Sequence, residues 1–246
     1  MLIVYRIYQI FIMIPLLAVA TVLAATVTII GSMLGAQRSM GYWPGHVWAR
    51  IFSMLSLVKV NVKGRENINA DTSYVFVANH QGAYDIFAIY GYLGHNFRWM
   101  MKKGLEKIPF VGYSCRVSGH IFVDSSTPSA TAHTMAAAEK QLSGGMSVVV
   151  FPEGSRSRDG KMHAFRRGAF KLATEFALPV VPITIDGAYR VMRRGAILPH
   201  WGTINLTIHK PIEVSAETGR HELADVMEKS SAAIASALPA SQRPDK

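Results

Sequence analysis

The strongest pattern in the sequence is an uncharged, apolar segment near the N-terminus. No charged residue occurs between positions 7 and 37. Residues 10–34 would extend about 37 Å as a helix, against about 30 Å for the hydrocarbon core of a bilayer. A cleaved signal peptide has a shorter apolar core, of roughly 7–15 residues, and a more basic start than the single Arg6. The segment therefore predicts a membrane-associated helix.

A second helix is predicted directly after this one. Apolar and polar positions alternate along residues 43–60, after a glycine-containing stretch at 41–45 that lets the chain turn back. Trp43 and Trp48 suit the headgroup level of a membrane, where amphipathic rings accumulate. We therefore expect an N-terminal two-helix membrane-anchoring element, with its second helix lying at the interface.

The rest of the chain alternates between strand-like and helix-like patterns. Short β-branched runs predict strands at residues 58–62, 73–79, 97–101, 120–124, 147–151, 180–185 and 203–209. Longer stretches predict helices at residues 85–91, 126–142, 165–176 and 221–237. This alternation predicts an α/β fold with a mostly parallel, about seven-stranded sheet flanked by helices. The predicted parts are membrane-associated helices (1–60), an α/β domain (61–240) and a disordered tail (241–246).

A histidine and an acid lie just after one predicted strand. His80 and Asp85 belong to the run Asn-His-Gln-Gly-Ala-Tyr-Asp. Five residues of continuous helix would leave their side chains about 140° apart, so the chain must turn if they are to meet, and Gly82 allows that turn. Imidazole removes a hydroxyl proton well near neutral pH, and a carboxylate would hold its tautomer. The pair is a candidate general base. The alternative is a capped helix start with a surface histidine.

A second polar cluster follows the strand predicted at residues 147–151. Glu153, Gly154, Ser155 and Arg156 come after a proline that ends the strand. Ligands of open α/β sheets bind at this end of the strands. Glycine lets backbone N–H groups approach an anion, and arginine offers a planar fork that matches phosphate oxygens. These residues predict a phosphate site, with a solvated charged turn as the alternative.

Composition narrows the classes of function. Hydrophobic residues make up 50% of the chain and the formal net charge is +10, which suits a protein that works against an anionic membrane surface. No basic helix, zinc pattern or RNA-binding motif supports nucleic acid as a partner. The histidines lack metal-ligand spacing, so no metal site is predicted. The single cysteine, Cys115, excludes an intramolecular disulfide.

Four ordered blocks make the chain resemble the glycerophospholipid acyltransferases, in particular the 1-acyl-glycerol-3-phosphate (lysophosphatidate) acyltransferases. The blocks are N-H-x-x-x-x-D at residues 79–85, G-H-I-F-V-D at 119–124, F-P-E-G-S-R-S at 151–157 and V-P-I-T-I at 181–185. The segment M-K-K-G-L at residues 101–105 is similar to the family's basic K-K-E-L segment. The resemblance covers roughly residues 58–215. It implies a seven-stranded α/β domain and an N-terminal two-helix membrane element.

The resemblance also implies an activity and a set of site residues. A fatty acyl group would pass from an acyl thioester, either acyl-CoA or acyl-acyl-carrier-protein, to the free hydroxyl of lysophosphatidate. His80 would remove the hydroxyl proton, and Asp85 would orient His80. The expected substrate-binding residues are Glu153, Gly154, Ser155, Arg156, Lys102 and Lys103. Glu153 is expected to hydrogen-bond within its loop or to a glycerol oxygen, and no bound cofactor is expected.

Two positions depart from the family pattern: Ser125 replaces an arginine and Gly104 replaces a glutamate. A missing guanidinium removes one possible phosphate contact. Another lyso-lipid, such as a lyso-ornithine lipid that lacks a phosphate, is therefore an alternative acceptor. A membrane-bound lipid hydrolase and a non-catalytic lipid-binding scaffold are alternative functions.

The charge distribution predicts an orientation in the membrane. Basic residues that follow the apolar segment, beginning with Arg38 and Arg50, outnumber the single Arg6 before it. This bias predicts an inner-membrane protein whose α/β domain faces the cytoplasm. Whether the first helix spans the bilayer or enters one leaflet is left open. The match Gly31-x-x-x-Gly35 is weak evidence for helix pairing, so a monomer is favoured.

Overall fold

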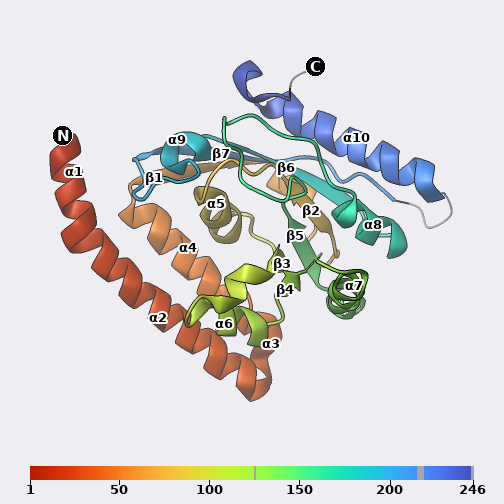
Figure 1. Ribbon diagram of the computed structural model, residues 1–246, viewed down its shortest axis with the longest axis horizontal. Coiled ribbons are helices and arrows are strands. Elements are labelled where there is room, and N and C mark those ends of the chain that lie inside the picture. Colours follow the sequence, from red (N-terminus) through yellow and green to blue (C-terminus); the bar gives the residue numbers. More distant parts are fainter. Residues whose placement is uncertain (125, 215–218, 245–246) are drawn as a thin grey trace.

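A seven-stranded sheet forms the centre of the protein (Figure 1). The computed structural model describes residues 1–124, 126–214 and 219–244. The strands are β1 (Val58–Lys63), β2 (Val75–Ala78), β3 (Phe97–Lys102), β4 (Ile121–Val123), β5 (Ser147–Val150), β6 (Val180–Asp186) and β7 (Gly202–Ile208). Their order is β1-β7-β6-β2-β5-β3-β4; β6 and β7 pair antiparallel and the other neighbours pair parallel. The predicted mostly parallel, seven-stranded α/β sheet is confirmed.

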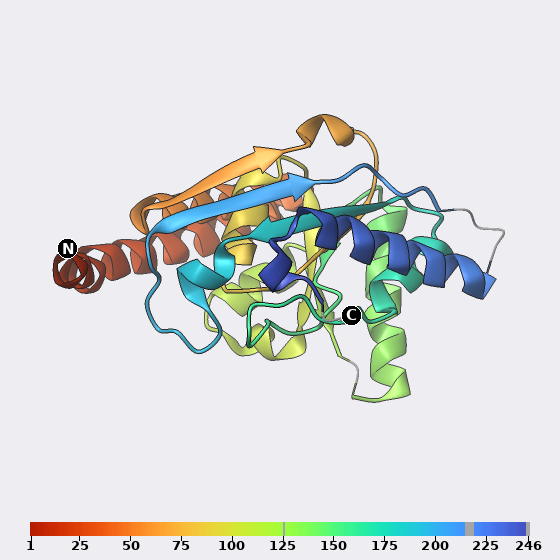
Figure 2. The same cartoon turned by 90° about the horizontal axis from the view of Figure 1, so that it is seen from above.

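Helices cover both faces of this sheet (Figure 2). One face packs against α4 (Trp43–Leu55), α5 (Tyr84–Tyr92) and α9 (Ala188–Met192). The other face packs against α7 (Pro128–Ser143), α8 (Gly168–Glu175) and α10 (Gly219–Ala237). In β2, Phe76 and Ala78 join the first core while Val75 and Val77 join the second. Burial on both faces explains why β2 is apolar at every position.

One helix in the described part of the chain, Leu2–Met40, is long and apolar enough to cross a membrane. It consists of α1 (Leu2–Tyr8), α2 (Ile14–Gly31) and α3 (Gln37–Met40), joined by two π-helical turns. Gly35, with a φ of +91°, marks a kink in the second turn. Many of its large apolar side chains are exposed, including Phe11, Val19, Leu23 and Val27. The helix is evidence for membrane association.

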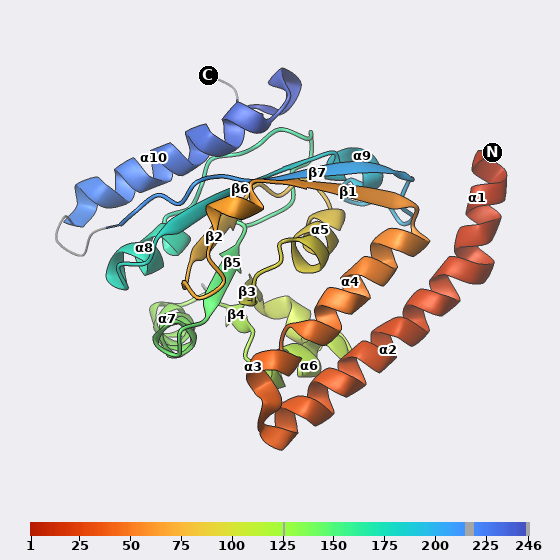
Figure 3. The same ribbon diagram turned by 180° about the vertical axis from the view of Figure 1, so that it is seen from behind.

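The second N-terminal helix, α4, folds back along α2 (Figure 3). The indole Nε1 of Trp48 donates a hydrogen bond to Thr21 Oγ1 of α2 at 2.9 Å. With 13 residues, α4 is about 20 Å long and too short to cross the hydrocarbon core. Ala49 and Ser53 of α4 are fully buried. The expectation of two membrane helices is therefore corrected to one long apolar helix, with a short helix that also packs on the α/β domain.

Both ends of the long helix are held against the α/β domain. Near its start, the side-chain Nε2 of the buried Gln9 donates to the carbonyl oxygen of Pro199, shortly before β7, at 2.8 Å. Near its end, the buried guanidinium of Arg98, on β3, donates to the carbonyl oxygen of Gln37 at 2.9 Å. The helix therefore contacts the domain near both of its ends, and α4 lies between α2 and the sheet (Figure 3).

The C-terminal segment is packed as far as Gln242. Ala240–Gln242 form a turn of 3-10 helix, and Gln242 is buried. The backbone N–H of Met162 donates to the carbonyl oxygen of Gln242 at 2.9 Å. This packing differs from the disordered tail expected from residue 241, of which residues 245 and 246 lie outside the described part.

Candidate active site

The turn between β2 and α5 brings His80 and Asp85 together. His80 follows the end of β2, and Asp85 lies in the first turn of α5, as their spacing requires. The Nδ1–H of His80 donates to Asp85 Oδ2 at 2.7 Å, because an ionised carboxylate can only accept. Asp85 is fully buried, whereas the His80 side chain is 14% exposed. The His80 Nε2 atom is left with a free lone pair.

Close packing fixes the backbone of this turn. The N–H of Gly82 donates to the same Oδ2 atom of Asp85 at 2.8 Å. A Cβ on Gly82 would lie 2.6 Å from the carbonyl oxygens of both Ala188 and Met192 on α9. Glycine is therefore required where the turn passes α9, and Asp85 is held by two donors.

The loop after β5 packs directly on His80. The Phe151 ring stacks on the imidazole, with centroids 3.9 Å apart and planes inclined by 10°. The N–H of Ser157 donates to the His80 carbonyl oxygen at 2.7 Å, and the N–H of His80 donates to Glu153 Oε1 at 2.7 Å. The two sequence blocks, distant in the chain, thus form one unit.

Glu153 braces the loop from inside. Its second oxygen, Oε2, accepts the N–H of His163 at 2.9 Å. The residue is 6% exposed, and burial raises the pKa of its carboxyl to about 7. Both oxygens are engaged by backbone N–H groups, and Glu153 is not among the described residues that line the cavity beside His80. Of the two expected roles, the contacts correspond to hydrogen bonding within the loop.

A cavity of about 1170 Å³ lies beside His80. Small and apolar side chains line much of it, contributed by α2, β3, α6 (Val111–Val117) and α7. Its polar lining combines His80 with Gly154, Ser155 and Arg156, and adds Lys102, Arg166 and Arg194. A long apolar space with a histidine and several cations can hold an acyl chain attached to an anionic head.

Two of these cations were absent from the predicted set. Arg166 lies against the loop at Gly154, whose φ is +75° and whose added Cβ would come within 2.9 Å of the Arg166 Cζ atom. The run Phe-Arg-Arg-Gly at residues 165–168, a few residues after the second polar block, was the available signal for Arg166. Arg194 comes from the loop between α9 and β7, where residues 193–195 repeat the same Arg-Arg-Gly run.

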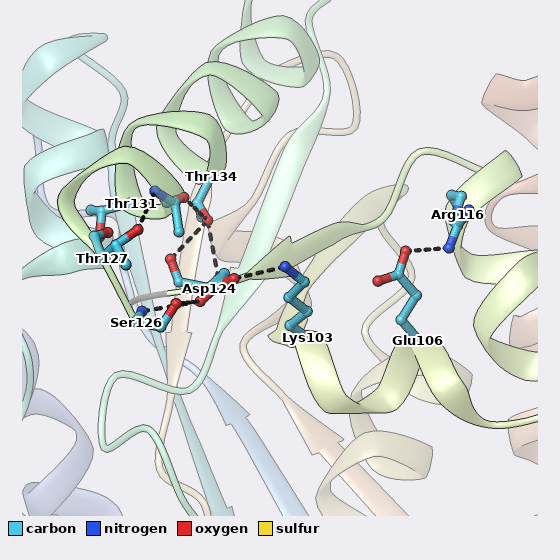
Figure 4. Close-up of polar contacts among 9 residues, drawn as sticks. Lys103, Glu106, Arg116, Asp124, Ser126, Thr127, Thr131 and Thr134 are labelled. Atoms are coloured by element: carbon cyan, nitrogen blue, oxygen red, sulfur yellow. Dashed lines mark hydrogen bonds and ion pairs between the residues drawn. The ribbon is translucent and has the colours of Figure 1, made fainter.

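The two predicted lysines have different surroundings. Lys102 lines the cavity, whereas the ammonium of Lys103 pairs with Asp124 Oδ2 at 2.8 Å (Figure 4). The Ser126 hydroxyl donates to Asp124 Oδ1 at 2.7 Å. Hydrogen bonds from Lys103 and Ser126 lower the pKa of Asp124, and the bond to Asp124 raises the pKa of Lys103. Lys103 is therefore paired with Asp124 and does not line the cavity. Ser125 lies outside the described residues.

Sequence comparisons connect this arrangement to known proteins. The profile of the family described as Acyltransferase matches residues 59–186. A chloroplast 1-acyl-sn-glycerol-3-phosphate acyltransferase of Arabidopsis thaliana is 34% identical over 200 residues, which is 78% of this chain and 55% of that protein. The enzyme of the same name from Saccharomyces cerevisiae is 29% identical over 216 residues, 82% of this chain and 71% of that protein. The chain spans 55% to 60% of the length of its relatives from A. thaliana, Brassica napus and Chlamydomonas reinhardtii.

The fold is also similar to a solved structure. The crystal structure of the 1-acyl-sn-glycerophosphate acyltransferase from Thermotoga maritima superposes with a TM-score of 0.76 at 27% sequence identity. The match covers 92% of this chain and 91% of that one. The likeness therefore extends beyond the α/β domain to the N-terminal helices.

Proposed function

The chain belongs to the acyltransferase family, and from that premise we propose that it transfers a fatty acyl group from an acyl thioester to the free hydroxyl of lysophosphatidate, forming phosphatidate. The relatives from A. thaliana and S. cerevisiae and the T. maritima structure carry names for this activity. The observation that supports it most strongly is the His80–Asp85 pair at the wall of a cavity that is both cationic and apolar.

His80 acts as the general base in this proposal. Its Nε2 atom takes the proton of the lysophosphatidate hydroxyl as the hydroxyl oxygen attacks the thioester carbonyl carbon. The new C–O bond forms, the C–S bond breaks, and the imidazolium returns its proton to the departing thiolate. Asp85 holds the Nδ1–H and stabilises the imidazolium, so the lone pair stays on Nε2.

The cations at the cavity would bind the acceptor's phosphate. Arg156 provides the planar fork, and Arg166 and Lys102 line the same cavity. Ser155 also lines the cavity. The N–H of Gly154 is engaged in the turn, where it donates to the Phe151 carbonyl oxygen at 3.0 Å. A lyso-ornithine acceptor has no phosphate to neutralise these cations, so the cavity favours lysophosphatidate.

The membrane element and the donor complete the proposal. The proposed parts are an anchor (1–60) and a catalytic domain (61–240). In support of a site at the membrane, Thr21, Ala25 and Thr28 of α2 form part of the cavity wall. The α/β domain would lie on the cytoplasmic side of the inner membrane, where acyl-CoA and acyl-acyl-carrier-protein thioesters are made. Either thioester fits the chemistry, since both present the same acyl–sulfur bond.

The test is a donor-by-acceptor matrix with mass detection of the lipid products. Purified protein in detergent is given acyl-CoA or acyl-acyl-carrier-protein with lysophosphatidate, other lysophospholipids or lyso-ornithine lipid. The expected product is phosphatidate, formed in step with free thiol. Release of free fatty acid without a lyso acceptor would identify a hydrolase, and preferred acylation of lyso-ornithine lipid would reject the proposed acceptor.

A further inference from the structure

The segment from Lys102 to Tyr113 exposes an unusual number of apolar side chains. Leu105, Ile108, Phe110 and Tyr113 are all exposed, and Phe110 reaches 58%. Exposed apolar patches on a soluble surface mark interaction sites. Neither the general-base pair nor the phosphate-binding cations account for this patch.

The backbone presents Phe110 under strain. Phe110 has a φ of +60° and a ψ of −51°, which a non-glycine residue rarely adopts. Gly112 packs so tightly behind it that an added Cβ would lie 2.0 Å from the Glu106 carbonyl oxygen. Such strain persists where surrounding contacts enforce it, and it concentrates at functional sites. The aromatic ring is therefore held outward by the fold.

Two ion pairs brace the segment on either side (Figure 4). Lys103 pairs with Asp124 at 2.8 Å, and Glu106 pairs with Arg116 at 2.5 Å. The exposed apolar side chains are thus carried by a fixed surface. Lys102 and Lys107 have no ion pair in the described part of the chain, so they add uncompensated positive charge beside the apolar cluster.

The same segment borders the active-site cavity. Leu105 and Ile108 are exposed and also line the cavity, which places an opening of the cavity at this segment. Helix α6, which follows directly, packs against α2 (Figure 1). The apolar cluster is therefore continuous with the exposed apolar face of the long N-terminal helix.

We propose that residues 102–113 insert into the lipid leaflet, as a second membrane contact beside the N-terminal helix, and that they open the cavity directly to the bilayer. Phe110 and Tyr113 would sit among the upper acyl chains and headgroups, where aromatic rings accumulate. Lys107, which does not line the cavity, would meet anionic headgroups. A lysolipid could then pass between α2 and this segment with its acyl chain always in an apolar environment.

Insertion can be measured without turnover, so this test is independent of the proposed function. A Phe110→Cys variant, in a Cys115→Ala background, is labelled with bimane and added to vesicles of phosphatidylethanolamine and phosphatidylglycerol. We expect quenching by nitroxides on the lipid acyl chains and protection from aqueous iodide. The matched control is Ser236→Cys on α10, an exposed position on the far side of the sheet, which should stay accessible to iodide.

Two results would overturn the proposal. If aqueous iodide still quenches bimane at position 110 in the presence of vesicles, the segment remains in water. Protection from iodide already present without vesicles, together with a dimer in solution, would assign the patch to a second copy of the chain.

A second experiment, which rests on the proposed function, measures reaction rates to test whether the substrate enters the cavity from the bilayer. Phe110→Asp should lower the rate on lysophosphatidate embedded in vesicles about tenfold or more, because an aromatic ring inserted in lipid is replaced by a charge. Phe110→Trp should keep the wild-type rate. Both variants should act normally on a short-chain, monomeric lysophosphatidate. If Phe110→Asp loses rate equally on embedded and on monomeric lysophosphatidate, entry from the bilayer is rejected. If the wild-type protein shows no turnover at all, the proposed function is rejected, but the insertion measurement still holds.

Discussion

Arg156 lies at the polar wall of the cavity and is half-buried, in the loop that also stacks Phe151 on His80. A guanidinium in this position can bind two phosphate oxygens at once. Arg158, two residues later, is exposed and does not line the cavity in the described structure. The two arginines therefore form a matched pair, equal in charge and different in placement.

Replacing Arg156 by alanine should raise the KM for lysophosphatidate and lower kcat/KM roughly ten- to hundredfold, because a charge-assisted hydrogen bond contributes about 1.5–3 kcal/mol. The KM for the thioester donor should change little. Steady-state kinetics with each substrate varied in turn provides the measurement. Arg158→Ala should behave as wild type; if both variants lose acceptor affinity equally, the effect is long-range charge and the phosphate is held elsewhere.

Among the candidate residues, sequence spacing predicted some placements and missed others. The His80–Asp85 contact follows from a turn that Gly82 allows, so it was predictable locally. Hydrogen bonding by Glu153 was one of its two expected roles, but its partners were not predictable, because His80 and His163 come from two different loops. The sequence could not show which of the two adjacent lysines faces the cavity. Lys102 lines the cavity, whereas Lys103 pairs with Asp124.

At the scale of elements, all seven predicted strands are present, and their limits shift by no more than a few residues. The helices α6 and α9 were missed because each is short and bounded by glycine or proline, without room for a helical period. The antiparallel placement of β7 beside β6 was also not predicted. Strand direction depends on the path of the connecting segment, which the pattern within a strand does not record.

The C-terminal turn Ala240–Gln242 connects elements that support the site. The side chain of Gln81, fully buried next to His80, donates to Gln242 Oε1, and Gln242 Nε2 donates to Asp186 Oδ1 at 3.2 Å. The turn therefore ties the β2–α5 turn to the end of β6.

Gln242→Ala should lower the free energy of unfolding by about 1–3 kcal/mol, since it leaves the buried Gln81 amide short of an acceptor. It should also reduce kcat, while the KM for both substrates stays close to wild type. Urea denaturation and steady-state kinetics measure the two effects. Ser241→Ala, at the exposed neighbouring position, is the control; equal stability of the two variants would show that the turn does not support the site.

At the scale of the whole molecule, burial sets how stability responds to acid. His120, at the start of β4, is buried and accepts the N–H of Trp99 on its Nδ1 atom at 3.0 Å. Burial lowers its pKa to about 3. The neutral ring is therefore stabilised in the folded state, and the unfolded chain binds a proton more readily. The stability that this group contributes is present above about pH 6.5 and is lost as the pH falls toward 3.

His120→Asn should reduce this dependence, because the asparagine oxygen can accept the Trp99 N–H and does not titrate. The difference in unfolding free energy between wild type and variant should shrink by up to about 1.4 kcal/mol per pH unit below pH 6.5. Denaturation of both proteins between pH 7.5 and 5 measures it. The other buried groups, including Glu153 with its raised pKa, are common to both proteins and cancel. A difference that stays constant with pH would contradict a neutral, buried His120.

The long N-terminal helix is attached at both ends, and its α2 residues form a wall of the cavity. The helix that is long and apolar enough to cross a membrane is therefore also part of the cavity beside His80. Hydropathy alone predicted the helix but not this role, because the contacts join it to distant parts of the chain, at Pro199 and Arg98.

The most direct test of the account is the turnover number of His80→Ala and Asp85→Asn, each shown to be folded by circular dichroism, with acyl thioester and lysophosphatidate at saturation. An asparagine at position 85 can donate to Nδ1 and shift the hydrogen to Nε2, so both variants should lose the free base. The account predicts that kcat falls about 10²- to 10⁴-fold in each, with little change in either KM. Wild-type turnover in either folded variant would contradict it.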